Sequence, residues 1–166
     1  AELVRMINTS TEINDRPCAF RYPRGTGLGS VLPSINEKIE IGKSKIIKEG
    51  KKLAILNFGS RLNETLKAAE NLKKKGIDIT IVDARFAKPL DENLIWQLAT
   101  THEAIMTIEE GSIGGFGSHV VNFRFSCFMF ACVHVFMFHV FMFSCFHVFI
   151  FSCCHVFIFY VYFCLL

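Results

Sequence analysis

The amino-acid sequence predicts an α/β protein built on a parallel sheet with flanking helices. Three apolar runs of strand length lie at 53–58, 77–82 and 104–108, and helical patterns of period 3.6 separate them. The connections between these runs are short, as is typical of strand–helix–strand units in a parallel sheet. A tail without any charged residue follows this unit, so the chain has two unlike parts.

The first forty residues predict a helix, a strand and a polar connector. Residues 1–14 carry apolar side chains at helical spacing, and Pro17 disfavours helix in the residue before it, so we expect the helix to end near there. The apolar run Cys18–Tyr22 predicts a short buried strand. Residues 34–42 are polar and have no clear helical period, so we place a domain boundary there.

From Lys45 onward each predicted element has recognisable limits. Residues 45–48 predict a weak strand, and the near-continuous apolar run 53–58 predicts a strand that is buried on both faces. A helix is expected over 61–75, with Ser60 as its N-cap and Gly76 as its stop. Further along, Asp91 is the expected N-cap of a helix over 92–100, and another helix begins at 118–123.

Ligands of parallel sheets bind at the carboxyl ends of the strands. These ends are predicted at 59–60, 83–85 and 109–117. For Glu109 and Glu110 we favour a solvated or dimer-facing strand end over acid–base catalysis. The glycine-rich turn after them could hold an anion at a helix N-terminus, but a strand-to-helix turn is reason enough for the glycines.

The segment 21–29 (RYPRGTGLG) concentrates two arginines, a proline and three glycines. The planar fork of arginine fits a phosphate or a carboxylate through two parallel hydrogen bonds, and glycines let backbone N–H groups approach an anion. The segment therefore predicts an anion site, most simply for a phosphate. The alternative is a solvated basic loop. The glycine spacing is neither that of a dinucleotide-binding fold nor that of a P-loop.

Charge and cysteine usage narrow the function classes. The formal net charge of +3 is too small and too mixed to predict nucleic-acid binding. Only Cys18 lies before the tail, so the body has no disulfide framework and suits a reducing compartment. The chain opens with Ala1 rather than Met and leads straight into an amphipathic run, which suggests a piece of a longer reading frame.

The tail, residues 124–166, is a repeat that has no charged residue after Arg124. After Arg124 it holds 13 of the 18 Phe residues, and the eight-residue unit 144–151 recurs at 152–159. We favour a frame-shifted or mis-joined translation of repetitive DNA. Membrane insertion is a second interpretation, since the uncharged run exceeds the ~20 residues of a membrane span. Metal binding by the recurring Cys-x-His pairs is the weakest interpretation, since a repeated sequence makes any potential ligand recur periodically. These pairs are Cys132–His134, Cys145–His147 and Cys153–His155.

The body resembles the thiamine-diphosphate-dependent transketolase-like family, and within it the 1-deoxy-D-xylulose-5-phosphate synthases. Four blocks carry the resemblance in the same order: RYPRGTGLG, LAILNFGSRLNETLKAAENLKKKG, VDARFAKPLD and HEAIMTIEEGSIGGFGSHV. It implies that 1–33 ends a pyrimidine-binding domain, that 34–42 is a linker and that 43–123 is a truncated transketolase C-terminal-like domain. We expect 124–166 to lie outside that fold.

The resemblance also implies an activity. These synthases condense pyruvate with glyceraldehyde 3-phosphate to 1-deoxy-D-xylulose 5-phosphate and release carbon dioxide, as the first step towards isoprenoid and thiamine precursors. They use thiamine diphosphate and magnesium, and the cofactor carries the carbanion chemistry. The implied assembly is a homodimer, and the implied compartment is the cytoplasm or a plastid.

Few residues of this chain match the functional residues of the family. Arg24 matches an arginine that contacts the substrate phosphate, and Arg21 is a weaker second choice. The diphosphate and metal motif, the activating glutamate and the upstream histidines are absent from the sequence, so no catalytic, cofactor-binding or metal-binding residue is assigned. His102 and His119 are expected to be surface or packing residues. We therefore expect the chain alone to be inactive; the alternative is a non-catalytic α/β dimerisation module with a membrane-inserting tail.

Overall fold

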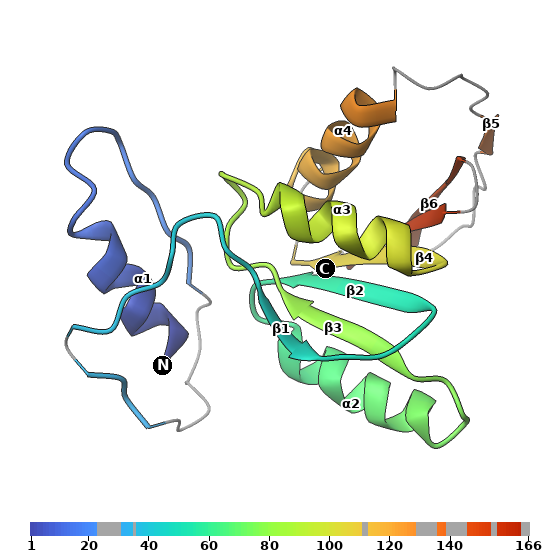
Figure 1. The fold of residues 1–166 in the computed structure, drawn as a ribbon, viewed down its shortest axis with the longest axis horizontal. Coiled ribbons are helices and arrows are strands. Elements are labelled where there is room, and N and C mark those ends of the chain that lie inside the picture. Colours follow the sequence, from blue (N-terminus) through green and yellow to red (C-terminus); the bar gives the residue numbers. More distant parts are fainter. Residues whose placement is uncertain are drawn as a thin grey trace.

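The fold was analysed in a computed structural model that describes residues 1–22, 31–34, 36–110 and 113–128 and the strand segments 136–138, 146–153 and 156–163. An α/β domain stands beside an N-terminal segment, residues 1–42, whose described residues include one helix (Figure 1). The helices are α1 (Glu2–Ser10), α2 (Leu62–Lys73), α3 (Glu92–Thr101) and α4 (Phe116–Phe128). The strands are β1 (Lys45–Lys48), β2 (Leu53–Phe58), β3 (Ile79–Asp83), β4 (Ala104–Glu109), β5 (Phe136–Phe138), β6 (Phe146–Cys153) and β7 (Val156–Phe163).

The predicted fold class is confirmed. The strands form one sheet in the order β1-β3-β2-β4-β7-β6-β5. Strand β2 lies at the centre of the first four strands and pairs in parallel with both β3 and β4, while β1 pairs antiparallel with β3. In the tail, β7 pairs in parallel with β4, and β6 and β5 continue the sheet antiparallel.

Alternating side chains of β2 enter two separate hydrophobic clusters, one on each face of the sheet. Ala54 and Leu56 pack with α3 and α4, and Ile55 packs with α2. Figure 1 shows α2 on one side of the sheet and α3 and α4 on the other. This double burial explains why the sequence of β2 is a near-continuous apolar run rather than an alternating one.

Helix ends in the domain follow local capping rules. At the end of α2, Gly76 has φ +78° and its N–H donates to the Lys73 carbonyl, while the Ile77 N–H donates to the Leu72 carbonyl. This pair of bonds is a Schellman motif, so Gly76 is the predicted stop. The prediction for Ser60 was wrong: the N-cap position of α2 is Arg61, and no side chain caps it.

Helix α1 is shorter than predicted. It ends at Ser10 rather than near Asn14, because consecutive hydroxyl side chains at its end bond to the backbone of the preceding turn. The Thr9 hydroxyl donates to the Arg5 carbonyl at 2.7 Å, and the Thr11 hydroxyl donates to the Asn8 carbonyl at 2.9 Å. Such side-chain bonds compete with continuation of the helix.

The predicted strand Cys18–Tyr22 was wrong. Its residues are exposed and have no regular secondary structure, and none of the strand pairs in the described part of the chain includes them. A strand exists only when a neighbour satisfies its backbone groups. The apolar composition of this run was therefore insufficient to predict its state.

Within the N-terminal segment, hydrogen bonds join the connector, residues 34–42, to α1. The Ile39 N–H donates to the Thr9 hydroxyl at 2.9 Å, and the Asn8 amide donates to the Glu37 carbonyl at 3.0 Å. Apart from Gly42 at its end, Thr9 and Ile39 are the only buried residues among those that the structure describes in this segment. Polar contacts rather than a hydrophobic core thus hold the connector against α1.

Strand β1 forms one edge of the sheet and is poorly suited to further pairing. Its register against β3 is interrupted between Ile46 and Lys48, and lysines stand at both of its ends. The Lys48 ammonium lies 2.8 Å from the Asp78 carboxylate. Edge lysines and register irregularities oppose the addition of another strand.

Within the described residues, no helix has the length and apolar character needed to cross a membrane.

The Asp91 carboxylate is expected to be the main polar contribution to the start of α3. It accepts from the Leu94 N–H at 3.3 Å and from the Ser44 N–H at 2.9 Å, and Asp91 is 9% exposed. Replacing Asp91 by Ala should therefore lower the free energy of unfolding by about 1–2 kcal/mol, measured by urea denaturation. The matched control is Glu92→Ala, an acidic first-turn residue without a capping bond, for which we expect about 0.5 kcal/mol or less. Equal losses would contradict the capping role.

Candidate functional site

The carboxyl ends of β2, β3 and β4 lie level with one another at one edge of the sheet. Asn57 of β2 stands opposite Asp83 of β3, and Phe58 stands opposite Glu109 of β4. This edge gathers charged side chains from four elements, since Arg85, Arg61, Glu110 and, from α1, Glu2 all reach it. It is the part of a parallel sheet where ligands bind.

The backbone of Arg85 is held in an uncommon conformation. Its φ is +57°, in the left-handed region that costs a non-glycine residue about 1–2 kcal/mol. Two bonds stabilise this turn: the Arg85 N–H donates to Asp83 Oδ1 at 3.2 Å, and the Ala84 N–H donates to the Asn57 carbonyl at 2.8 Å. Strain of this kind at a strand end points to a functional position.

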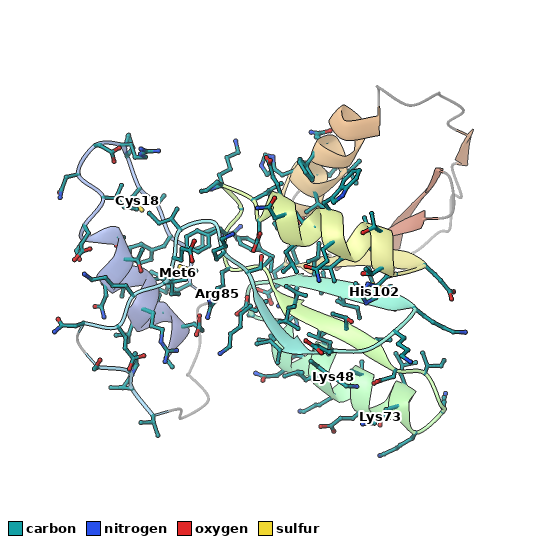
Figure 2. The ribbon with its side chains drawn as sticks, viewed as in Figure 1. Met6, Cys18, Lys48, Lys73, Arg85 and His102 are labelled. Carbon is teal, nitrogen blue, oxygen red and sulfur yellow. The ribbon has the colours of Figure 1, made fainter. Side chains whose placement is uncertain are left out.

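The Arg85 side chain lies where the N-terminal segment meets the α/β domain (Figure 2). It is 14% exposed, and its Nε lies 2.9 Å from Glu2 Oε2. This contact is an ion pair without hydrogen-bond geometry, because both atoms are buried and neither makes a hydrogen bond. The charge of Arg85 is thus paired, but its Nε makes no hydrogen bond.

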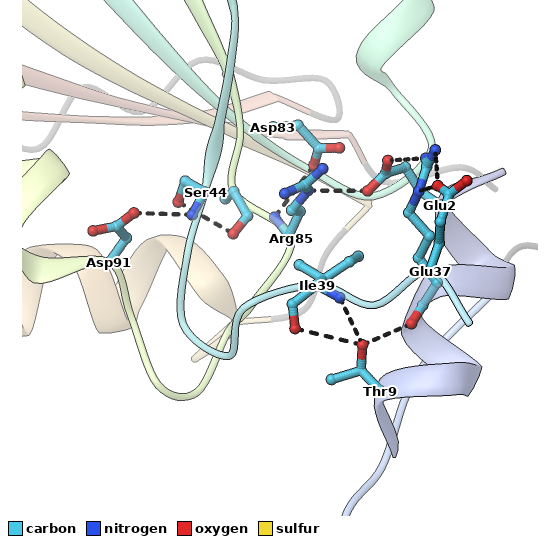
Figure 3. A network of polar contacts seen from close by, with 10 residues as sticks. Glu2, Thr9, Glu37, Ile39, Ser44, Asp83, Arg85 and Asp91 are labelled. Carbon is cyan, nitrogen blue, oxygen red and sulfur yellow. Dashed lines mark hydrogen bonds and ion pairs between the residues drawn. The ribbon is translucent and has the colours of Figure 1, made fainter. Parts of the chain in front are cut away.

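Glu2 has a second and better-formed partner. Its Oε1 accepts a hydrogen bond of 2.8 Å from the Arg5 guanidinium, and Arg5 Nε in turn donates to Glu37 at 2.8 Å. Figure 3 shows this network, which runs from the connector through α1 to the end of β3. Glu2 therefore bridges two arginines, one from its own helix and one from the sheet.

Burial raises the pKa of the Asp83 carboxyl above its ordinary value of 3.8. The nearby Glu2 carboxylate raises it further, while the bond from the Arg85 N–H and the charges of Arg85 and Lys45 oppose the rise. A raised pKa means that the fold disfavours the ionised carboxylate. Asp83 therefore holds the Arg85 turn at an electrostatic cost at neutral pH.

At the end of β4, the Glu109 side chain caps the N-terminus of α4. Its carboxylate accepts from the Phe116 and Gly117 N–H groups, both at 3.0 Å, and Glu109 is 6% exposed. A Cβ on Gly115 would stand 2.5 Å from that carboxylate, so a larger residue there would displace the Glu109 side chain. The expectation of a solvated or dimer-facing Glu109 was wrong, and the anion at this helix N-terminus belongs to the protein itself.

Arg61 and Glu110, which are also charged and lie at this edge, form an ion pair nearer the surface. Arg61, at the start of α2, lies 3.0 Å from the Glu110 carboxylate, which is 45% exposed. Glu110 is therefore the solvated residue of the Glu109–Glu110 pair. The described anchor of β2 at this edge is Asn57, which is 0% exposed and donates to the Gly59 carbonyl at 3.1 Å.

The sequence assigned phosphate binding to Arg24 and Arg21. In the described residues, no contact joins either of them to this edge. Arg21 is exposed, and Arg24 lies outside the described part of the chain, as do the side chains of the Cys-x-His pairs of the tail. Sequence reasoning missed Arg85 as a candidate. The available signal was an Asp-x-Arg run directly after a buried strand of a parallel sheet.

The described residues do not fit the metal–diphosphate group that the family implies. Within the described ranges, no group of three His, Cys, Asp or Glu side chains could hold a metal ion. His102 contacts the Thr80 hydroxyl through Nε2 at 2.8 Å, at the end of the sheet away from Arg85. The chemistry available at the carboxyl edge is anion recognition by arginine.

Removal of the Glu109 carboxylate should destabilise the domain. Glu109→Ala would leave two buried N–H groups without acceptors, so we expect the free energy of unfolding to fall by about 2–3 kcal/mol in urea denaturation. Glu110→Ala is the matched control and should cost less than about 1 kcal/mol, because it removes a surface ion pair. A similar cost for both variants would show that Glu109 is not a cap.

The effect of Asp83→Asn should depend on pH. The amide keeps a hydrogen-bond acceptor and removes the charge that burial disfavours, so we expect the variant to be more stable than the parent at pH 7. Because a raised folded-state pKa costs stability only as pH rises through it, the difference should vanish below pH 3.8. Urea unfolding at several pH values measures this.

Asp78→Asn is the control of opposite sign. The neighbouring Lys48 ammonium lowers the pKa of Asp78, so the contribution of Asp78 to stability is present above pH 3.8 and is lost as pH falls through the folded-state value. The variant should be less stable than the parent at pH 7. The same sign for Asp78→Asn and Asp83→Asn would contradict the role of burial at Asp83.

Comparison with known proteins places this geometry in a family. The family model described as "Transketolase, C-terminal domain" matches residues 42–144, which is more than half of the chain. A solved structure described as "Split gene transketolase, inactive beta4 tetramer" is similar, with 34% sequence identity and a TM-score of 0.53. The match covers 58% of this chain and 33% of that chain, so this chain spans about a third of the solved one. The parallel sheet, its flanking helices and the matched range together show that the chain belongs to the transketolase C-terminal domain family.

Proposed function

We propose that the chain is part of a transketolase-like synthase that condenses pyruvate with glyceraldehyde 3-phosphate to 1-deoxy-D-xylulose 5-phosphate and releases carbon dioxide. Membership of the transketolase family supports a transferase-type enzyme. The four sequence blocks that resemble the 1-deoxy-D-xylulose-5-phosphate synthases support this particular reaction. In this proposal, residues 1–33, 34–42 and 43–123 are the end of a pyrimidine-binding domain, a linker and a C-terminal domain.

The single observation that carries the proposal is the state of Arg85. A largely buried arginine whose Nε makes no hydrogen bond stands on a strained backbone at the carboxyl end of a parallel strand. Buried charged donors are costly to leave unbonded, so such a residue suits a ligand that brings its own oxygen atoms. A phosphate monoester offers these in the geometry that arginine recognises.

The role proposed for this chain is to bind the aldose phosphate. Arg24 contributes one guanidinium, because it follows Pro23 in an arginine–glycine segment, and Arg85 contributes another from the end of β3. Thiamine diphosphate and a divalent metal, which transketolases typically use, supply the carbanion chemistry when bound. Their ligands would come from sequence that this chain does not include, and a homodimer is the expected assembly.

A second candidate is a non-catalytic module that contributes only an oligomer contact. The similar solved structure is described as an inactive tetramer, which favours this alternative for chains of related sequence. Size-exclusion chromatography with light scattering measures the oligomeric state on which the second candidate depends. A stable oligomer that neither binds phosphate nor gains activity with the upstream half would support the module.

An activity assay tests the proposed reaction. The chain with pyruvate, glyceraldehyde 3-phosphate, thiamine diphosphate and magnesium should give no product, because the described residues do not provide a metal site. A chain extended upstream to include the cofactor motifs should give 1-deoxy-D-xylulose 5-phosphate. Product from the short chain alone would overturn the first expectation, and no product from the extended chain would overturn the proposed function.

Arginine substitutions in the extended chain test phosphate binding. Arg24→Ala and Arg85→Gln should each weaken the use of glyceraldehyde 3-phosphate by about 1.5–3 kcal/mol in kcat/KM, the cost of a lost charged hydrogen bond. The handling of pyruvate should change much less. The control is Arg61→Gln, which removes an arginine that already pairs with Glu110 at the same edge. Equal losses for both substrates would mean that the substituted arginine is structural.

A further inference from the structure

Two arginines share the Glu2 carboxylate, and they share it unequally. Arg5 forms a hydrogen bond of 2.8 Å to Oε1, whereas Arg85 Nε stands 2.9 Å from Oε2 without hydrogen-bond geometry. Among the described residues, no other carboxylate forms an ion pair with Arg85. Loss of the second contact would leave the first intact, so Glu2 would not become an unpaired charge.

The surroundings of Arg85 make the sharing unfavourable. Asp83 and Glu2 place two carboxylates beside one guanidinium, and the Glu2 charge contributes to the raised pKa of Asp83. Lys45 is the other cation that acts on this cluster from the sheet. An anion that makes full hydrogen bonds to Arg85 could therefore compete with a carboxylate that makes none.

We propose that Glu2 is an exchangeable internal counter-ion of Arg85, which a phosphate monoester displaces from the guanidinium while Glu2 stays bonded to Arg5. The proposal rests on the proposed function, in which Arg85 binds the substrate phosphate. It adds a regulatory consequence: binding at the end of β3 loosens the attachment of α1. By linkage, the docking of α1 and the binding of phosphate oppose each other equally in free energy.

The proposal predicts tighter phosphate binding when the Glu2 charge is removed. Glu2→Gln keeps the size of the side chain and a hydrogen-bond acceptor for Arg5, but it no longer repels an anion at Arg85. In calorimetric titrations of the full chain with inorganic phosphate, we expect the Kd of Glu2→Gln to be several-fold lower than that of the parent. Arg85→Gln should abolish this binding.

The matched control is Glu12→Gln. Glu12 is also a carboxylate of the N-terminal segment and pairs with Lys38, away from Arg85. The substitution changes the net charge by the same amount as Glu2→Gln, so it reports any general electrostatic effect. Its Kd for inorganic phosphate should equal that of the parent chain.

Hydrogen exchange of the unsubstituted chain gives a second measurement that needs no variant. Saturating inorganic phosphate should speed the exchange of amides in α1, because Arg85 releases Glu2. Amides of β2, which is buried on both faces, should not change. Slower exchange in α1 on addition of phosphate would overturn the proposal.

The outcomes separate this proposal from the proposed function. Phosphate binding that requires Arg85 but is unchanged or weakened in Glu2→Gln would refute the counter-ion role and leave the phosphate site standing. No Arg85-dependent binding in either chain would overturn both. Tightening in Glu12→Gln as large as in Glu2→Gln would also overturn the counter-ion role, because the effect would then be one of net charge.

Discussion

The burial of β2 on both faces is the constraint on which the rest of the domain depends. Its alternate side chains enter two hydrophobic clusters, so helices must cover both sides of the sheet. Helix α2 covers one face, and α3 and α4 cover the other. Because β3 and β4 run parallel to β2 on either side, three strand ends meet at one edge. The position of the candidate site follows from this arrangement.

Two of the carboxylates at that edge, Glu109 and Glu2, differ in how well they are bonded. Glu109 receives two backbone hydrogen bonds at the start of α4 and fills its position completely. Glu2 faces Arg85 without a hydrogen bond and makes its good bond elsewhere. Buried polar groups are normally fully bonded, so the incomplete pair is the informative one. Glu109 occupies the helix N-terminus, whereas Nε of Arg85 has no hydrogen-bond acceptor.

Much of the domain could be predicted from its sequence because local signals decide it. Residues 53–58 have the length and apolar character of a doubly buried strand, and Gly76 and Asp91 mark helix ends by their backbone and capping chemistry. The run Cys18–Tyr22 has similar apolar character but finds no pairing partner among the described residues. Strand formation depends on a neighbour, which composition cannot supply.

The candidate site was harder to predict than the fold, for a related reason. Glu2 and Arg85 meet only because α1 docks at the end of β3, and no sequence period relates two residues so far apart. The buried state of Glu109 depends on the path of the glycine turn, which lets its carboxylate reach Phe116 and Gly117. Side-chain type indicated the chemistry at each strand end, and the tertiary contacts decided which charges were already neutralised.

Because β1 opposes further strand pairing, the sheet extends on the side of β4. Its lysines and interrupted register oppose the arrival of another strand, whereas β4 accepts a parallel neighbour over its whole length. Strand β7 occupies that position, with Ala104 opposite Phe157 and Glu109 opposite Tyr162. The strands that extend the sheet beyond β4 therefore begin next to the strand end that carries Glu109. The strand that is added to the sheet and the charged side chains of the carboxyl edge are therefore neighbours. A change in the strand beside β4 would alter the surroundings of Glu109.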